Sequence, residues 1–270
     1  VPTPQKKDGS CDSSIVESVV RKFSKDKEKI FVIKSTVEPG TTERLQKKHK
    51  TKVFFSPEFL METRAKENFV KPDRQIVGPA ANSAAGIGLA QKILNILPKA
   101  PLISPNIQAN PHALKINASE AELGKYGANV FGAMKVVFGN ILADFGAGLE
   151  KVLAGEKKVK INYNNIRKIV AGDKRIGDAW LNVQYENYRG FGGYCFPKDL
   201  NAFIAFGKKL KRKLAQNDKD RKLISKGLYF LEAMRDYNIA LLKSQNINID
   251  KLGGHDHVKV AKRLKNAKTK

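Results

Sequence analysis

The segment KIFVIKSTVEPGTTERLQKKHKTKVFF, residues 29–55, decides the fold of the first part of the chain. Its apolar run at residues 29–34 has the length of a buried strand and leads into a Glu-Pro-Gly turn at residues 38–40. Residues 41–49 can form a helix, and the apolar residues 52–55 are a second strand candidate. Strands that alternate with helices predict a parallel sheet with helices on its faces.

The same alternation continues on both sides of this segment. Helical spacing of apolar residues covers residues 13–23 and 84–97, and short strand candidates lie at residues 74–78 and 100–103. We therefore expect an α/β fold whose first domain, residues 1–110, is a partial Rossmann-like parallel sheet.

The chain then becomes helical. Ser119 is a candidate N-cap with Glu122 completing a capping box, and a long apolar-periodic helix follows to about residue 149. We expect an all-helical central domain for dimerisation and catalysis at residues 111–213, and a divergent, helical and Lys-rich region at residues 214–270. Within these domains the spacing predicts further helices at residues 162–170, 197–213 and 220–244.

Small residues recur along the long helix. Gly132, Gly139 and Gly146 are spaced seven residues apart, although a glycine costs about 1 kcal/mol inside a helix. Such repetition indicates that something packs close to the backbone on that side. Core packing within one chain is one interpretation; we favour the other, a subunit interface that makes this a dimerisation helix.

Composition limits the class of protein. The 270 residues are 41% hydrophobic, and no apolar run has the roughly 18 residues of a membrane span. The two cysteines form no disulfide framework and suit a reducing cytoplasm, and the polar start at Val1 shows no signal peptide. The net charge of +24 comes mostly from lysines spread along the chain, which favours a solvated surface. We expect neither a membrane nor a nucleic-acid partner.

Residues 189–199, Arg-Gly-Phe-Gly-Gly-Tyr-Cys-Phe-Pro-Lys-Asp, carry the clearest chemistry. Glycines before Cys195 let the backbone approach a ligand and adopt positive φ. Pro197 suits the first position of a helix, so Cys195 is expected near a helix N-terminus, where the dipole favours a thiolate. Lys198 adds positive charge, and Asp199 can hold the thiol or a water in place.

Residues 191–199 also resemble the active-site signature of the UDP-glucose/GDP-mannose dehydrogenase family. Other stretches resemble that family in the right order, and together they cover residues 1–199. They are Val1-Pro-Thr-Pro4 with Asp12-Ser-Ser14, Lys34-Ser-Thr-Val37 with Gly40-Thr-Thr42, Ser56-Pro-Glu-Phe-Leu60 with Glu62, Pro72-Asp-Arg74, Glu122-Leu-Gly-Lys-Tyr126 with Asn129, and Arg175-Ile-Gly177.

The resemblance implies an NAD-dependent oxidoreductase of polysaccharide biosynthesis that acts on a nucleotide sugar. Two successive oxidations turn the C6 alcohol of the sugar into a carboxylate. Cys195 is implied to attack the aldehyde intermediate, giving a thiohemiacetal and then a thioester that water hydrolyses. UDP-glucose, oxidised to UDP-glucuronate, is the expected substrate, and GDP-mannose is the competing one. A cytoplasmic homodimer is expected.

The chemistry of the matching residues agrees with these roles. Lys125 and Asn129 are four residues apart on one helix, so both can stabilise a developing alkoxide. Glu58 and Glu62 have the same spacing and can orient a water or take a proton, although an isolated pair would indicate a helix N-terminus. Thr36 would place a hydroxyl near the same water and the cofactor.

The resemblance implies binding residues as well. Arg175 is expected to reach the substrate of a neighbouring subunit, and no metal ligand is expected. The residues implied to bind substrate are Phe59, Leu60, Arg175, Phe191, Gly192 and Gly193, and those implied to bind NAD are Thr36, Glu62 and Lys198.

The chain also departs from the family pattern. It has no Gly-x-Gly-x-x-Gly turn for the NAD pyrophosphate; the nearest stretch, Gly86-Ile-Gly88-Leu-Ala90, lies in a helix-like segment. The C-terminal nucleotide-binding domain is not recognisable, and residues 177–190 are longer than expected. Two interpretations remain open: a fragment of a full enzyme, which the non-Met start favours, or a shortened homologue that acts as a non-catalytic dimerisation or binding module. We expect the isolated chain to be poorly active.

Overall fold

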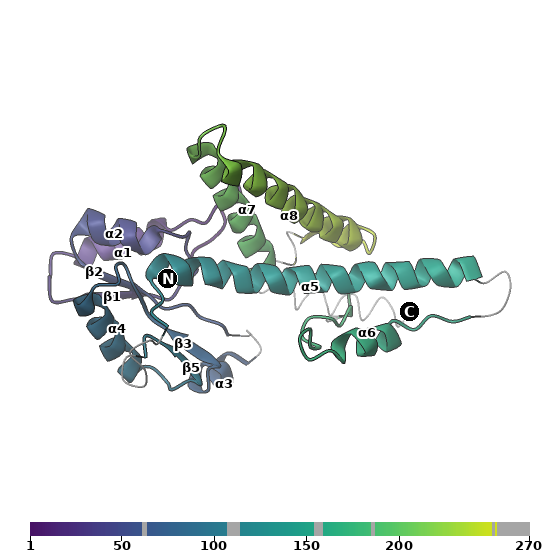
Figure 1. Ribbon diagram of the computed structural model, residues 1–270, viewed down its shortest axis with the longest axis horizontal. Coiled ribbons are helices and arrows are strands. Elements are labelled where there is room, and N and C mark those ends of the chain that lie inside the picture. Colours follow the sequence, from purple (N-terminus) through teal and green to yellow (C-terminus); the bar gives the residue numbers. More distant parts are fainter. Residues whose placement is uncertain (61–63, 107–113, 154–158, 185–186, 250–251, 253–270) are drawn as a thin grey trace. The chain divides into compact units, whose positions relative to one another are not determined.

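The structure, a computed structural model, describes residues 1–60, 64–106, 114–153, 159–184, 187–249 and 252. The chain divides into two compact units, Val1–Gly127 and Ala128–Lys270. The boundary falls inside the long helix α5 (Ala118–Leu153), so each unit contains part of it. Figure 1 shows the order of the elements along the chain. The three domain ranges expected from the sequence stay a prediction.

The described residues of the first unit form five short strands. The parallel pair β1 (Ile30–Ile33) and β2 (Lys52–Phe55), with α2 (Thr41–His49) between them in the chain, confirms the predicted strand–helix–strand unit. Two findings were not predicted. The expected strand at residues 74–78 divides into β3 (Arg74–Ile76), parallel to β5 (Leu102–Ser104), and β4 (Gly78–Pro79), which pairs with β2 in the antiparallel sense. The strands therefore form two small sheets instead of one parallel sheet.

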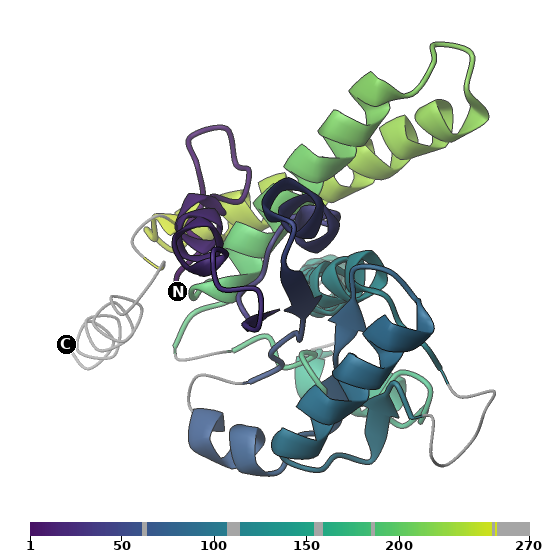
Figure 2. The same ribbon diagram turned by 90° about the vertical axis from the view of Figure 1, so that its left-hand side faces the viewer.

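Helices cover both faces of the β1–β2 pair because successive side chains of a strand point to opposite faces. On one face Ile33, Val53 and Phe55 pack with helices α1 (Ser14–Phe23) and α2 and with the first turns of α5. On the other face Phe54 packs against α4 (Ala84–Ile96). Figure 2 shows these helices on opposite sides of the strands. A further helix, α3 (Ala65–Val70), was not expected from the sequence.

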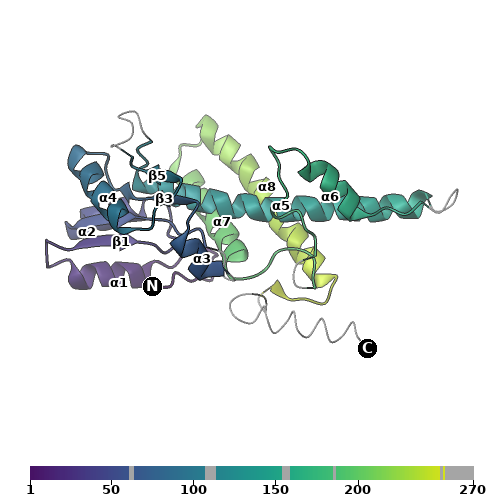
Figure 3. The ribbon, with the colours of Figure 1, turned by 90° about the horizontal axis from the view of Figure 1, so that it is seen from below.

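The second unit is helical, as expected. It contains the rest of α5 together with α6 (Tyr163–Ala171), α7 (Cys195–Lys213) and α8 (Lys219–Lys243). Helices α7 and α8 form an antiparallel hairpin, which Figures 1 and 3 show beside α5. Their apolar sides make one core with α5, in which Val137, Leu200 and Met234 are buried.

The start of α5 differs from the predicted one. The helix begins at Ala118, and the capping box consists of Asn117 and Glu120: the Asn117 N–H donates to Glu120 Oε2 over 2.7 Å, and the Glu120 N–H donates to Asn117 Oδ1 over 2.9 Å. The expected pair, Ser119 and Glu122, was wrong because both residues lie inside the helix and bond to the segment around α2 instead.

The glycine stripe of α5 faces the same chain, which supports core packing as the reason for these glycines, while a subunit interface on α5 stays a prediction. A Cβ atom at Gly132 would lie 2.7 Å from Phe196, and one at Gly139 would lie 2.8 Å from the Tyr163 hydroxyl. A Cβ atom at Gly146 would lie 3.0 Å from Ile161. The glycines therefore allow α6 and the start of α7 to pack closely on the backbone of α5.

Helix α5 is also long and apolar enough, by length and composition alone, to cross a membrane. The statement that no apolar stretch has this length was therefore wrong. Polar side chains of the helix nevertheless have partners within the chain. Lys135 donates to the Ile176 carbonyl over 2.8 Å, and the fully buried Asn140 accepts from Arg189 over 3.0 Å. Such partners come from the same chain, whereas a lipid bilayer offers none.

Candidate active site

Cys195 is the first residue of α7 and is exposed. The prediction that it lies at a helix N-terminus is confirmed. Pro197 is the third residue of the helix, not the first; it is tolerated there because the N–H groups of a first turn have no intrahelical acceptor. The other cysteine, Cys11, is buried in the first unit, where its thiol donates to the Thr36 carbonyl over 3.4 Å.

One turn further along α7, Asp199 is almost completely buried, with a relative exposure of 1%. Its Oδ2 accepts a hydrogen bond from Asn129 of α5 over 2.5 Å, and its Oδ1 forms an ion pair with Lys198. The structure thus brings three predicted site residues together. Because the ammonium group of Lys198 is paired with this buried carboxylate, its charge stabilises Asp199 directly.

Aromatic rings surround the residue that follows the cysteine. Phe196 makes edge-to-face contacts with Trp180, at 6.1 Å between ring centroids, and with the buried Phe191, at 6.3 Å. Gly132 of α5 makes room for the Phe196 ring. Such contacts hold the first turn of α7 in one orientation.

In the first unit, Lys125 is buried and its ammonium nitrogen lies 5.0 Å from the centroid of the Phe59 ring. The Arg74 guanidinium lies 3.7 Å from the same centroid. The structure therefore brings the predicted residues Lys125 and Phe59 together through cation–π contacts. Arg74 lies in a stretch that resembles the family, Pro72-Asp-Arg74, but no role was predicted for it from the sequence.

Glu58 forms an ion pair with Lys34 at 3.2 Å, and Lys34 also donates to the Ser56 hydroxyl over 3.3 Å. Lys34 was missed as a partner of Glu58, although it stands two residues before Thr36 in a motif that the sequence already indicated. Lys34 thus holds the Glu58 carboxylate in place just after β2. Glu62 lies outside the described residues.

A buried carboxylate connects the start of α5 to the turn that follows Thr36. Glu122 is fully buried and accepts hydrogen bonds from the Gly40 N–H (2.6 Å), the Thr42 N–H (3.0 Å) and the Thr42 hydroxyl (2.6 Å). Burial raises the pKa of Glu122 to about 7, with a smaller contribution from Glu43, against the lowering effect of its hydrogen bonds. This contact, which we call the Glu122 clamp, fixes α5 one turn before Lys125.

The remaining predicted residues are less constrained. The Arg175 side chain is 89% exposed and pairs with Asp173 at 2.6 Å, while Thr36 and Leu60 are half-buried. The part of the chain that the structure describes contains no group of three or more His, Cys, Asp or Glu residues suited to a metal ion.

Two family models match the chain. Residues 1–96 match the NAD binding domain of the UDP-glucose/GDP-mannose dehydrogenase family, and residues 119–219 match its central domain. The chain belongs to this family. The resemblance seen in the sequence is confirmed, and the match extends past Asp199 into the α7–α8 hairpin.

Members of the dehydrogenase family with known names align over most of the chain. The UDP-glucose 6-dehydrogenase of Pseudomonas aeruginosa is 34% identical over an alignment of 217 residues that covers 76% of this chain and 42% of that protein. The UDP-glucose 6-dehydrogenase of Haloferax volcanii is 32% identical over an alignment of 224 residues that covers 76% of this chain and 46% of that protein. The chain thus spans less than half the length of these relatives.

Solved structures of the family share the fold. A UDP-glucose dehydrogenase from Pyrobaculum islandicum, 32% identical, superposes with a TM-score of 0.64 over 90% of this chain and 51% of that chain. A UDP-D-ManNAc dehydrogenase from Pyrococcus horikoshii, 20% identical, superposes with a TM-score of 0.63 over 91% of this chain and 53% of that chain, which shows the fold alone. The expected fold class, a partial Rossmann-like region followed by a helical central domain, is confirmed.

Proposed function

We propose that the complete protein containing this chain oxidises the C6 alcohol of a UDP-sugar to a carboxylate, with NAD as the oxidant and Cys195 as the covalent nucleophile. One observation carries the proposal. An exposed thiol stands at the N-terminus of α7, one turn before a buried Asp199 that Asn129 and Lys198 hold, in a chain of the UDP-glucose/GDP-mannose dehydrogenase family.

The residues present fit part of an NAD site. Thr36 follows β1 and Glu58 follows β2, so both stand at the carboxyl edge of two parallel strands, where α/β sheets bind dinucleotides. The 270 residues contain no Gly-x-Gly-x-x-Gly turn, and Gly86 and Gly88 lie inside α4, where they cannot cradle a pyrophosphate. Bound NAD would accept one hydride in each of the two oxidations.

The side chains around the sugar would stabilise charge and hold water. In the first oxidation the C6 alcohol loses a proton and a hydride, and the Lys125 ammonium and the Asn129 amide stabilise negative charge on its oxygen. Thr36 and Glu58 orient the water that is used later, and Asp199 holds the Cys195 thiol in place.

Cys195 then acts on the aldehyde. Its thiolate adds to the carbonyl carbon, forming a C–S bond and a thiohemiacetal. Loss of the second hydride leaves a thioester, and water adds to its carbonyl carbon, breaking the C–S bond and releasing the thiolate. In total, one alcohol, one water and two NAD⁺ give one carboxylate, two NADH and three protons.

A panel of substrates tests the proposal. The full-length protein is mixed in turn with UDP-glucose, GDP-mannose and UDP-N-acetylhexosamines, and the absorbance of NADH is followed. We expect UDP-glucose to give two NADH per sugar. The proposal is overturned if no nucleotide sugar yields NADH. The isolated chain is expected to produce little, because its sequence lacks the pyrophosphate-binding turn.

We also infer a homodimer formed through α5. On this helix Phe131, Phe138 and Phe145 are 53%, 51% and 72% exposed, and each stands one residue before a glycine of the stripe that packs on its own chain. Their spacing of seven residues makes one apolar seam along the helix, which a second copy of α5 can cover.

Sedimentation of a Phe138→Lys/Phe145→Lys variant tests this inference. The variant is expected to sediment as a monomer at concentrations where the unmodified chain is a dimer, because lysines would be buried in the seam. Tyr229→Lys, at a 74% exposed position of α8, is the control and should remain a dimer. A monomeric unmodified chain would contradict the inference. A cytoplasmic location and the absence of nucleic-acid and membrane partners stay predictions.

A further inference from the structure

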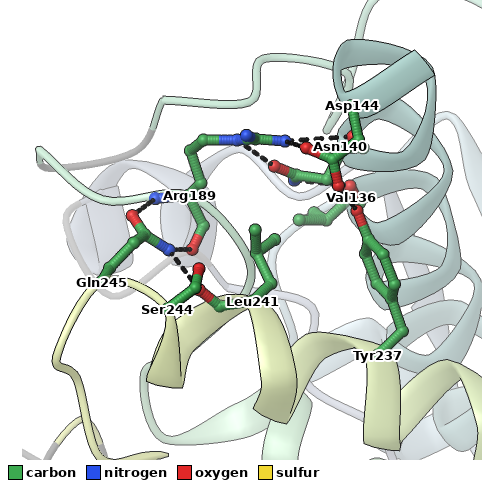
Figure 4. Close-up of polar contacts among 8 residues, drawn as sticks. All are labelled: Val136, Asn140, Asp144, Arg189, Tyr237, Leu241, Ser244 and Gln245. Atoms are coloured by element: carbon green, nitrogen blue, oxygen red, sulfur yellow. Dashed lines mark hydrogen bonds and ion pairs between the residues drawn. The ribbon is translucent and has the colours of Figure 1, made fainter. Parts of the chain in front are cut away.

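The loop that leads to Cys195 is bonded to two side-chain amides from the α8 region. Asn238 accepts from the Phe191 N–H over 2.8 Å and donates to the Phe191 carbonyl over 2.9 Å. Gln245 accepts from the Arg189 N–H over 2.8 Å and donates to the Arg189 carbonyl over 3.0 Å, as Figure 4 shows. Two amides thus satisfy the backbone groups of alternate residues, as a neighbouring strand would.

The same loop is tied to α5 through the side chain of Arg189. Its guanidinium donates to Asn140 Oδ1 over 3.0 Å and to Asp144 Oδ1 over 2.6 Å. The Tyr237 hydroxyl of α8 donates to the other oxygen of Asp144 over 2.5 Å (Figure 4). Burial and the bond to Asp144 raise the pKa of Tyr237, so its hydroxyl remains a donor at neutral pH.

The glycines of the loop fit closely against these partners. Gly190 has φ +96°, and a Cβ atom there would lie 2.7 Å from the Asn238 side-chain oxygen. A Cβ atom at Gly192 would lie 2.8 Å from Leu252, whose carbonyl accepts from the Gly193 N–H over 3.1 Å. Asn238, Gln245 and Leu252, which lie beyond the matched family model, therefore shape the backbone up to two residues before Cys195.

We propose that Asn238 is a positioning residue for the reaction of Cys195, acting through the backbone of Phe191. Asn238 is fully buried and Phe191 is 4% exposed, so neither backbone group of Phe191 has water as an alternative partner. Loss of the amide would leave both groups unsatisfied, and the loop would have to move toward solvent. This proposal rests on the proposed function in one respect: it takes Cys195 as the nucleophile.

A purely stabilising role would give a different result, and Leu228→Ala separates the two. Leu228 is buried in the core that α8 shares with α5 and α7, which also includes Phe191; it packs on Gly207, and its side chain makes no hydrogen bond to the loop. Its truncation leaves a cavity in the same helix and keeps both amides in place. It therefore lowers stability without removing a bond to the loop.

The experiment uses the 270-residue chain without substrate. Amide hydrogen exchange at Phe191 and the pH profile of Cys195 alkylation by iodoacetamide are measured in the unmodified chain, Asn238→Ala and Leu228→Ala. We expect Asn238→Ala to speed exchange at Phe191 by roughly tenfold or more and to shift the alkylation profile, and Leu228→Ala to leave both near their original values. Equal effects of the two variants on exchange and alkylation would overturn the proposal.

Asn238→Asp provides a conservative rescue. A protonated carboxyl can donate and accept as the amide does, whereas an ionised one accepts only and repels the Phe191 carbonyl. Exchange at Phe191, corrected for its intrinsic pH dependence, should match the unmodified chain at low pH and become faster at high pH, where the repelled carbonyl opens the loop. A pH-independent result would overturn the proposal. If the full-length protein oxidises no nucleotide sugar while these results hold, the proposed function fails and the positioning of the loop stands.

Discussion

The two units hold their candidate catalytic segments with different chemistry. In the first unit the Glu122 carboxylate accepts three hydrogen bonds from Gly40 and Thr42 at the start of α2. In the second unit the amides of Asn238 and Gln245 each accept one hydrogen bond and donate another to the loop before Cys195.

The difference follows from what each backbone segment offers. A helix N-terminus presents N–H groups only, so a carboxylate, which has acceptors only, can satisfy several of them at once. An extended loop presents an N–H and a C=O at each residue, and an amide matches both. The carboxylate also titrates, whereas the amides do not. The Glu122 contact is therefore expected to respond to pH, whereas the contacts made by the two amides are not.

The largest expected effect is on the reactive residue itself. Cys195→Ser in the full-length protein is expected to lower uronic acid formation by at least about 10³-fold, because a hydroxyl is a far weaker nucleophile than a thiolate. Product is measured by chromatography after mixing with UDP-glucose. Cys11→Ser is the control and should keep normal turnover, since Cys11 is buried and a serine hydroxyl can also donate to the Thr36 carbonyl. Normal uronic acid formation by Cys195→Ser would refute its assignment as nucleophile.

Removing Glu122 from the first unit is expected to cost more stability than removing the Asn238 amide from the second. Glu122→Ala removes the acceptor of three donors and should lower the unfolding free energy by about 4 kcal/mol, while Asn238→Ala should lower it by about 2 kcal/mol. Urea unfolding of both variants measures the difference. Leu123→Ala is the control: Leu123 is beside Glu122 but 45% exposed, so its truncation should change the unfolding free energy only slightly. A greater loss from Asn238→Ala would reverse the ranking.

The Glu122 carboxyl and the two amides should also differ in how their contributions to stability depend on pH. The pKa of Glu122 rises from an ordinary 4.5 to about 7 on folding, so its contribution is fully present below pH 4.5 and is lost as the pH rises through 7. Relative to Glu122→Gln, the unmodified chain should lose about 3 kcal/mol of unfolding free energy across this interval. Urea unfolding at several pH values measures it, with Gln245→Ala as a variant that should leave the slope unchanged. Parallel curves for the unmodified chain and Glu122→Gln would contradict the raised pKa.

The smallest expected effect concerns the ion pair of Lys34 with Glu58. Both side chains are about one-third exposed, so Lys34→Met should change the unfolding free energy by less than about 1 kcal/mol. The substitution should matter more for turnover of the full-length protein, because Glu58 would lose the partner that holds its carboxylate in place. A change in stability comparable to that of Glu122→Ala would show that this contact is a third structural clamp.

Local patterns in the sequence were sufficient for much of the fold. The helix at Thr41–His49 and the strand at Lys52–Phe55 lie where apolar spacing and turn residues placed them, and Cys195 begins its helix as expected from the nearby glycines and proline. These features depend on neighbours in the chain, which the sequence displays directly.

Partners far apart in the chain were not predictable in this way. The glycines of α5 pack on their own chain, the strand expected at residues 74–78 joins two different sheets, and Glu122 caps α2 instead of its own helix. Asn238 lies 47 residues from the loop it bonds, and nothing in the residues between them indicates that pairing.

The sequence by itself therefore determined the family, the order of helices and strands, and the thiol at the start of α7. Only the tertiary structure decided which face of α5 is covered and which side chains hold the segments around Thr36 and Cys195. The reason is physical: helix and strand propensity act over a few residues, whereas the burial of a polar side chain is stable only where a distant segment supplies its hydrogen-bond partners.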